Sequence, residues 1–543
     1  MIKLKLIIFL LFLCFLCIPV YAQSATQFPA QDEEEVNTEE TESIKIINYD
    51  PNAVYFINSF NYNVTGRTLP FMLNTKTELK KGEEIKGYNK LIDFISNKKQ
   101  LLINERVLKD NVRIEYTLGE PNEEGKIPVA LEIYTEDTWN IIALPYPKYD
   151  SNTGFELTIK ARDYNFLGTM NALRFDFGYK YDQKGRSYYN LMLDTGIPFN
   201  LFGLKWLIDF DNDFTYRPDR DLEYYYKNST GLSVDLPIGL STLTLSFHEQ
   251  FIFNDELSEK DKKEYLLEFQ EGFYLSSKPE ISWKIPTPLE IGPYGFLTYT
   301  PSFSTVINHE LSAWELIENR DGATLTFAHN LGFGRVNWIG NFKKGLSASV
   351  SNSFNRFYSF QREDWDPFYN DISVSAAGYF VFTDFIGLSS RIMYRHYFNT
   401  YNETAGDVIR GILDDEIDAE YIVSLNIDIP VRALKIRPSE WFPNNRAARI
   451  FDFDMHLVPV FDIAFYQNYP YIEKTFGKEN ILMGGGIELI IFPHRWRSLF
   501  LRISAGWDFS NIALKTPMEL FIGMDLFYYD IIWQISQLLE QVM

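Results

Sequence analysis

The side chains that could support catalysis or bind a metal are few and widely separated in this chain of 543 residues. No two histidines have the HExxH spacing that places zinc ligands on one helix face, and both cysteines lie near the N-terminus. No glycine-rich phosphate-binding loop is present. We therefore predict no metal, no cofactor and no enzymatic activity; the alternative is a lipase-type site in which a serine and a histidine meet. The histidines are His248, His309, His329, His396, His456 and His494.

A single arginine lies in a setting where a charge is unusual. Within AGDVIRGILDDE, Arg410 and Gly411 are enclosed by Val408, Ile409 and Ile412. As an exposed loop residue, Arg410 would contribute about 0–1 kcal/mol to stability. Alternatively, its planar guanidinium could bind a carboxylate through two parallel hydrogen bonds, and Gly411 would let the backbone turn sharply. These residues alone favour the exposed arginine.

The N-terminus predicts export from the cytoplasm. Two lysines precede an uninterrupted apolar run that ends in VYA, a sequence with the pattern of a cleavage site, so residues 1–22 are predicted to be a secretory signal peptide. The mature chain then has no cysteine, and hence no disulfide. The formal charge of −22 argues against nucleic acid as a partner. Residues 23–43 are acidic and contain no lysine or arginine, which predicts a disordered linker.

From about residue 150 onward, apolar and polar residues alternate, as in NALRFDFGYKY. No apolar run after the signal peptide reaches the ~20 residues of a membrane helix, and 16% of the residues are aromatic. A soluble sandwich would show the same period, but alternation sustained over roughly 390 residues with short turns favours an outer-membrane barrel. At ~24 residues per strand and turn, residues 150–529 are predicted to form an all-β membrane barrel of about 16 antiparallel strands.

A small domain is predicted before the barrel, over residues 44–140. Its first segment, YFINSFNYNVTG, reads as a strand, and Pro70 opens a first helical stretch. Apolar residues from Tyr88 to Ile95 then follow the spacing of a helix face, and NVRIEYTL and PVALEIYTE alternate as strands. The order β-α-α-β-β predicts one compact α+β domain with a modest core.

Several motifs occur in an order that is typical of one family. ARDYNFLGTM contains an Asp-x-Asn-Phe-x-Gly-Thr pattern, VIRGI contains the arginine–glycine pair, and five strand-like segments follow it. Together they resemble the BamA/TamA/FhaC superfamily, in which the first motif closes the first hairpin and the second is carried on the sixth extracellular loop. The small domain, with VTGRT after its first strand, resembles a POTRA module. The residues of the first motif are Asp163, Asn165, Phe166 and Gly168.

The resemblance implies that the Arg-Gly loop folds back into the barrel lumen. Arg410 is then expected to bind Asp462 on the inner wall. Asn426 stands where relatives often place a second lumenal carboxylate, and Asp428, on the same face, is its expected substitute. Removing one partner of a desolvated pair of this kind would cost about 3–5 kcal/mol. This chain departs from the family pattern at three further positions, which are Ile412, Ala464 and Glu488.

The resemblance also implies a seam in the barrel wall. The terminal strand carries Gly523, Leu526 and Tyr528 at the spacing of the outer-membrane β-signal. The strand over about 154–163 is expected to close the barrel against it. A glycine weakens local strand pairing, so the seam could open and its edges could template an incoming strand. The POTRA-like domain would receive clients in the periplasm through similar pairing.

The leading functional expectation is an assembly or insertion factor of the bacterial outer membrane that works without covalent chemistry. The alternatives on the same fold are a dedicated exporter of the two-partner type and a passive channel or surface antigen. Unfolded polypeptide clients and outer-membrane lipid are the expected partners, with accessory lipoproteins as a further option. Residues 530–543 have apolar residues at helical spacing, which predicts an amphipathic tail.

Overall fold

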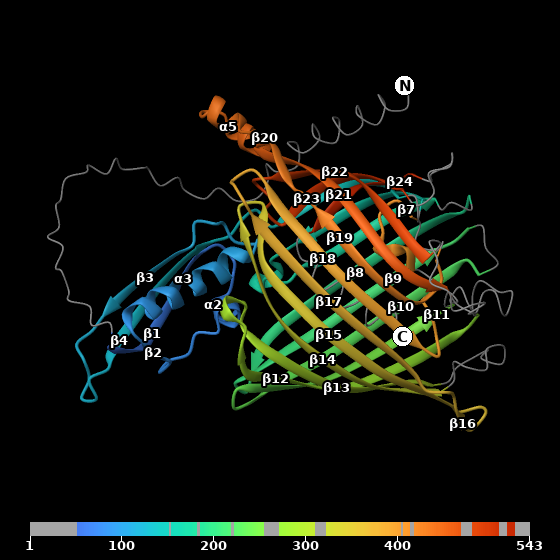
Figure 1. Ribbon diagram of the computed structural model, residues 1–543, viewed down its shortest axis with the longest axis horizontal. Coiled ribbons are helices and arrows are strands. Elements are labelled where there is room, and N and C mark those ends of the chain that lie inside the picture. The colour runs from blue at the N-terminus through green and yellow to red at the C-terminus, as the bar shows by residue number, and fades with distance from the viewer. Residues whose placement is uncertain are drawn as a thin grey trace.

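The computed structural model contains a small α+β domain followed by a closed β-barrel (Figure 1). It describes residues 52–150, 154–181, 185–218, 222–254, 271–309, 322–402, 405–412, 417–468, 480–509 and 518–526. The signal peptide, the acidic linker, Tyr528 and the tail at 530–543 lie outside the described residues. The sequence-based expectations for these segments stay predictions.

The N-terminal domain packs two helices against a four-stranded sheet. Pro70 occupies the first turn of α2, where its missing N–H costs nothing, and α3 buries Leu91 and Leu102 against Leu131 and Ile133 of the sheet. The sheet order is β2-β1-β4-β3, with β1 parallel to β4. This is the expected β-α-α-β-β order with one short strand added. The elements are β1 (Val54–Thr65), α2 (Pro70–Thr77), β2 (Glu84–Lys86), α3 (Tyr88–Asn104), β3 (Arg113–Leu118) and β4 (Ile127–Glu136).

The barrel is closed by 18 antiparallel strands, so the expected number of about 16 is wrong. Short strands β16 (Asp364–Trp365) and β20 (Val431–Ile436) supplement the wall. The barrel strands are β5 (Ile141–Asp150), β6 (Gly154–Asp163), β7 (Leu173–Tyr181), β8 (Ser187–Leu201), β9 (Leu204–Tyr216), β10 (Tyr224–Ile238), β11 (Ser241–Phe253), β12 (Phe273–Glu290), β13 (Phe296–His309), β14 (Gly322–Ile339), β15 (Phe342–Ser359), β17 (Tyr369–Val381), β18 (Gly387–Phe398), β19 (Ala419–Asp428), β21 (Phe453–Asn468), β22 (Ile481–Pro493), β23 (Leu499–Asp508) and β24 (Met518–Leu526).

Prolines explain the two strands that the sequence pattern did not reveal. β5 contains Pro145 and Pro147, and β12 contains three prolines within 18 residues. Proline normally argues against a strand interior because it cannot donate a ladder hydrogen bond. Here β5 pairs with β6 along its full length, and β12 pairs with β11 as a separate strand from β13. The barrel sheet therefore begins at Ile141.

The outer surface of the barrel is apolar. Along β6, Phe155, Leu157 and Ile159 are 40–53% exposed, whereas Thr158 between them is 2% exposed. The same alternation places Phe461 outward and Asp462 inward on β21. An apolar outer face over a polar inner face is the pattern of a barrel embedded in lipid. Among the described residues, no helix has both the length and the hydropathy needed to span a bilayer.

The barrel closes between β24 and β5, which corrects the expectation that the strand at 154–163 lies at the seam. That strand is β6, the second in the wall, and β5 separates it from β24. Within the described residues, the closing ladder has two paired positions, Phe521 with Asp150 and Ile522 with Tyr149. By contrast, β24 pairs with β23 over nine positions, from Leu499–Leu526 to Trp507–Met518. Gly523 and Leu526 are thus part of the β23–β24 ladder.

Short turns join the strands at one end of the barrel, which we name the turn end. The opposite end, named the loop end, carries the longer connections. The N-terminal domain, blue in Figure 1, lies at the turn end. It lies there because β5 enters the wall only five residues after β4 ends at Glu136.

Candidate functional site: an internal loop and a domain joint

The connection between β18 and β19 lies inside the barrel. With 18 strands, it is the seventh connection at the loop end, not the sixth. Its described residues are 399–402, 405–412 and 417–418. Ala405–Val408 form a 3-10 turn, and Ile409 and Ile412 are almost completely buried. They pack in an apolar cluster that includes Ala464 of the inner wall. Burial of these side chains stabilises the inserted position of the loop.

Arg410, at the tip of this loop, contacts three carboxylates. Its backbone N–H and Nε donate to Asp462 Oδ2 at 3.0 and 2.8 Å, and Nη2 donates to Asp462 Oδ1 at 2.6 Å. Nη2 also lies 2.6 Å from Asp428 Oδ1, and Nη1 lies 3.5 Å from Glu488 Oε1. Asp462 is fully buried, whereas the Arg410 side chain is 21% exposed. The structure thus brings together the arginine and both carboxylates named from the sequence.

Asn426 and Glu488 complete the inner-wall contacts. Asn426 pairs with Asp462 across the β19–β21 ladder, and its Nδ2 donates to the carbonyl oxygen of Val408 at 2.8 Å. This amide therefore holds the loop backbone, while Asp428 faces the guanidinium. Glu488 also lies 3.9 Å from Arg502 Nη1 of β23. Two arginines near Glu488 offset the cost of placing a third acid beside Arg410.

Glycines let the loop approach the wall closely. Gly411 has a φ of 96°, in the region that favours glycine, and a Cβ there would lie 2.6 Å from the Trp507 carbonyl oxygen. A Cβ at Gly484 would overlap the Arg410 carbonyl oxygen and lie 2.7 Å from Ile409 Cγ2. A Cβ at Gly506 would lie 2.6 Å from Gly411 N. Glycines on the loop, on β22 and on β23 are therefore needed for the loop to lie this close to the barrel wall.

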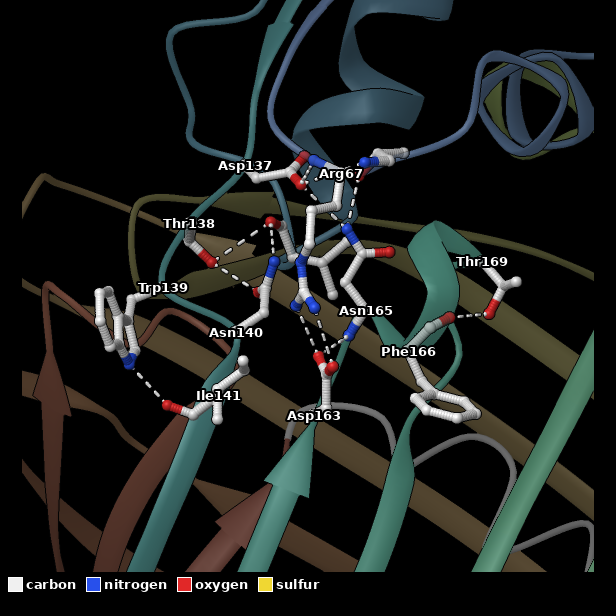
Figure 2. Close-up of polar contacts among 12 residues, drawn as sticks. Arg67, Asp137, Thr138, Trp139, Asn140, Ile141, Asp163, Asn165, Phe166 and Thr169 are labelled. Carbon is white, nitrogen blue, oxygen red and sulfur yellow. Dashed lines mark hydrogen bonds and ion pairs between the residues drawn. The ribbon is translucent and has the colours of Figure 1, made fainter. Parts of the chain in front are cut away.

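The Asp-x-Asn-Phe-x-Gly motif forms the turn between β6 and β7, and this turn binds the N-terminal domain (Figure 2). Asp163 accepts hydrogen bonds from Arg67 Nη1 and Nη2 at 3.1 and 2.8 Å. Buried Asn165 donates to Thr68 Oγ1 at 2.7 Å and to Asp137 Oδ2 at 3.0 Å. Asp137 also accepts from the Arg67 backbone N–H and from Thr68 Oγ1. The motif thus joins barrel and domain.

Gly168 brings the two backbones into direct contact at this joint. Its carbonyl oxygen accepts a hydrogen bond from the Leu69 N–H at 2.9 Å. Its φ is 75°, and a Cβ at this position would overlap the Arg67 carbonyl oxygen. The Phe166 carbonyl oxygen accepts from Thr169 Oγ1 at 2.7 Å, which stabilises the turn itself.

A second set of contacts holds the domain on the far side of the barrel mouth. Asn104, the last residue of α3, donates to Asn337 Oδ1 and accepts from the Trp338 N–H, both at 3.0 Å. Buried Arg106 donates to Asn341 Oδ1 at 3.1 Å, and its guanidinium lies 4.8 Å from the Trp338 ring centre. Because eight strands separate the β6–β7 turn from the β14–β15 turn, the domain spans the mouth.

The turn between β22 and β23 adds a third point of attachment. Arg497 Nη1 donates to the Leu108 carbonyl oxygen at 2.7 Å, and Ser498 Oγ donates to the Arg106 carbonyl oxygen at 3.3 Å. Burial, and then the neighbouring charge of Arg497, lower the pKa of Arg106 well below its usual range.

Arg67 lies in the VTGRT segment that the sequence analysis names, so its pairing with Asp163 could have been inferred from the sequence. Asp137 and Arg106 belong to no motif.

No family model matches the chain, and no curated protein matches it. Among solved structures, it is similar to BamA from Haemophilus ducreyi lacking POTRA domains 1–3, with 12% identity, coverage of 87% of this chain and 84% of that chain, and a TM-score of 0.38. CdiB from Acinetobacter baumannii has 12% identity, 87% and 74% coverage, and a TM-score of 0.43. CdiB from Escherichia coli has 9% identity, 91% and 92% coverage, and a TM-score of 0.39.

Proposed function

We propose that the protein is a BamA-superfamily factor of the bacterial outer membrane that inserts polypeptide strands through the β24–β5 seam. The observation that carries this proposal is the closing ladder, which has two paired positions within the described residues, next to a β23–β24 ladder of nine. A short ladder separates at lower cost than a long one, and separated strands expose backbone donors and acceptors. Such edges bind an extended segment by strand addition.

The N-terminal domain supports the same proposal. As a POTRA-like module at the turn end, it would lie in the periplasm and meet a client before the barrel does. Its sheet ends in β3, whose one neighbour among the described strands is β4. The outer edge of β3 is therefore suited to pairing with an unfolded chain. The clients, the lipids and any accessory lipoproteins belong to this proposal.

A locked seam tests the proposal. The mature chain has no cysteine, so Tyr149→Cys with Ile522→Cys would place one disulfide across β24 and β5, whose Cα atoms are partners there. The matched control is Ile503→Cys with Ile522→Cys, which ties β24 to β23 at the same residue. The measurement is the rate at which membranes containing each variant assemble a newly synthesised barrel client.

We expect the seam disulfide to stop assembly and a reductant to restore it, while the control disulfide leaves the rate unchanged. Continued assembly with a fully oxidised seam would contradict the proposal. If both disulfides stop assembly, β24 is sensitive to any cross-link, and insertion through the seam loses its support.

A further inference from the structure

The longest connection at the turn end is a hairpin that extends the barrel wall, and we name residues 431–457 the rim hairpin. β20 continues the line of β19 along β21, and α5 (Pro438–Trp441) and a 3-10 segment, Arg446–Phe451, form the tip. In Figure 1, β20 and α5, in orange, project beyond the neighbouring strands. Several other turns at this end contain two residues, such as 202–203. The Arg410 contacts described above involve no residue of the rim hairpin. Its Asp454 accepts a hydrogen bond from Asn341 Nδ2 at 2.9 Å, and Asn341 in turn accepts from Arg106 of the N-terminal domain.

Side-chain hydrogen bonds fix the shape of the rim hairpin. Arg437 donates to the carbonyl oxygens of Ile436 and Phe453 at 2.8 Å and to Asp454 Oδ1 at 2.6 Å. Asp452 accepts from the Ser439 N–H at 3.0 Å and from its hydroxyl. The hairpin is thus a built structure that presents its tip in one orientation.

The outward face of the rim hairpin continues the lipid-facing wall. On β21, Phe461 and Phe465 are exposed on the outer face, and Leu457 follows them at the same period. Leu434 of β20, 48% exposed, pairs with Met455 on that face. At the tip, Trp441 and Phe442 are 61% and 60% exposed. Exposed apolar residues on the wall and on β20, together with exposed aromatic residues at the tip, fit the boundary between acyl chains and headgroups.

The net charge of the rim hairpin is positive, opposite in sign to that of the whole chain. The rim hairpin, residues 431–457, contains five arginines and lysines and three acids, although the chain carries a formal charge of −22. Arg437 binds Asp454, and Arg432 lies 3.0 Å from Asp384. Arg449, in the 3-10 segment of the tip, is exposed, whereas Lys435 pairs with Asp454 on the face of β20 opposite to Leu434. Cations beside exposed aromatic residues are complementary to a surface of anionic phospholipid.

We propose that the rim hairpin binds the anionic phospholipid surface of the membrane leaflet at the turn end. Trp441 and Phe442 enter the headgroup–acyl boundary, and Arg449 contacts lipid phosphates. Continuity with the lipid-facing wall favours lipid over a protein partner as the occupant. The inference needs the barrel to be in a bilayer, and it holds whether the protein inserts clients, exports them or forms a pore.

Site-specific quenching tests the inference. Trp441→Cys gives a single cysteine in the mature chain, which can carry an environment-sensitive fluorophore. Glu123→Cys, in the exposed turn between β3 and β4, is the matched control. Both proteins are placed in nanodiscs of phosphatidylcholine alone or mixed with phosphatidylglycerol. Quenching is measured with a lipid-attached quencher near the headgroup and with iodide in the water.

We expect the lipid quencher to act on the label at 441 and iodide to act on the label at 123. Phosphatidylglycerol should strengthen the lipid quenching at 441, and the variant Arg449→Gln should lose this dependence. A label at 441 that iodide reaches as readily as the control would overturn the inference. If the same labels are also measured in native membranes, protection at 441 that arises only there would overturn the inference too, because it would assign the face to a protein partner. Lipid quenching that is equal in both nanodiscs would remove the role of Arg449.

Discussion

Arg410 Nη2 lies 2.6 Å from Asp462 Oδ1, and the backbone N–H of the same arginine donates to the other oxygen of that carboxylate. Both the side chain and the main chain of the loop are therefore tied to one buried acid. The loop occupies the lumen through this pair, through Asn426 and through the apolar packing of Ile409. Each of these contacts can be changed separately.

Replacing Arg410 should release the loop from the inner wall. In Arg410→Ala, the fully buried Asp462 carboxyl loses its guanidinium partner, and we expect a loss of about 3 kcal/mol in the stability of the closed loop. Arg410→Lys should lose nearly as much, because an ammonium cannot form the paired contact. Single-channel conductance in planar bilayers should increase for both variants. Arg432→Ala, which removes an exposed pair with Asp384, should leave conductance unchanged; an equal increase there would remove the special role of Arg410.

A methyl group at Gly484 should displace the loop without changing any charge. In Gly484→Ala, the new Cβ would overlap the Arg410 carbonyl oxygen, and relief of such overlap in packed structure typically costs about 1–3 kcal/mol. We expect faster proteolysis within the loop of the folded barrel. Gly378→Ala is the control, because its Cβ would meet no atom closer than 3.2 Å. If the loop of Gly484→Ala resists protease as the parent does, the close approach is not needed.

The joint between the barrel and the N-terminal domain should depend on Asn165 more than on Asp163. Asn165→Ala leaves Asp137 and Thr68 with fewer partners in a buried site, which should cost about 1–3 kcal/mol. Asp163→Asn weakens an ion pair in which Arg67 is half exposed, worth about 0–1 kcal/mol. Hydrogen exchange at the Leu69 N–H should therefore accelerate more in Asn165→Ala. The reverse order would contradict the burial argument.

Loss of Arg106 should release the N-terminal domain from the β14–β15 turn, while its contacts with the β6–β7 turn persist. In Arg106→Ala, the contacts with Asn341 and Trp338 are lost. Spin labels at Glu123 and on the β14–β15 turn should then give a broader distance distribution. Arg113→Ala, an exposed residue of the same domain, is the control. An unchanged distribution in Arg106→Ala would mean that Asn104 and Arg497 hold the domain without it.

Depletion of the protein in its own bacterium should lower the abundance of many outer-membrane barrel proteins. Quantitative proteomics of the outer membrane is the measurement, with inner-membrane proteins as the internal reference. Loss of one secreted protein alone would point to a dedicated exporter. No change in either class would support a passive channel and contradict the proposed insertion function.

The Arg410–Asp462 pair was within reach of the sequence because each residue belongs to a recognisable pattern. Strand alternation fixes the face on which Asp462 lies, and the Arg-Gly pair marks a loop that can approach a wall. Gly484 and Gly506 were not within reach, since a glycine in a strand does not reveal which backbone lies opposite. The contacts of Arg106 were also hidden, because its partners lie more than 200 positions away in the sequence.

By itself, the sequence determined the alternation of a barrel, the α+β order of the first domain and the candidate acids around Arg410. These features depend on local periodicity and on motifs of a few residues. Only the tertiary structure decided the 18 strands, the closure of β24 on β5 and the position of the domain across the mouth. Proline-containing strands pair or fail to pair according to their neighbours. Closure and docking likewise depend on contacts between segments that are distant in sequence, and local residue patterns do not encode those contacts.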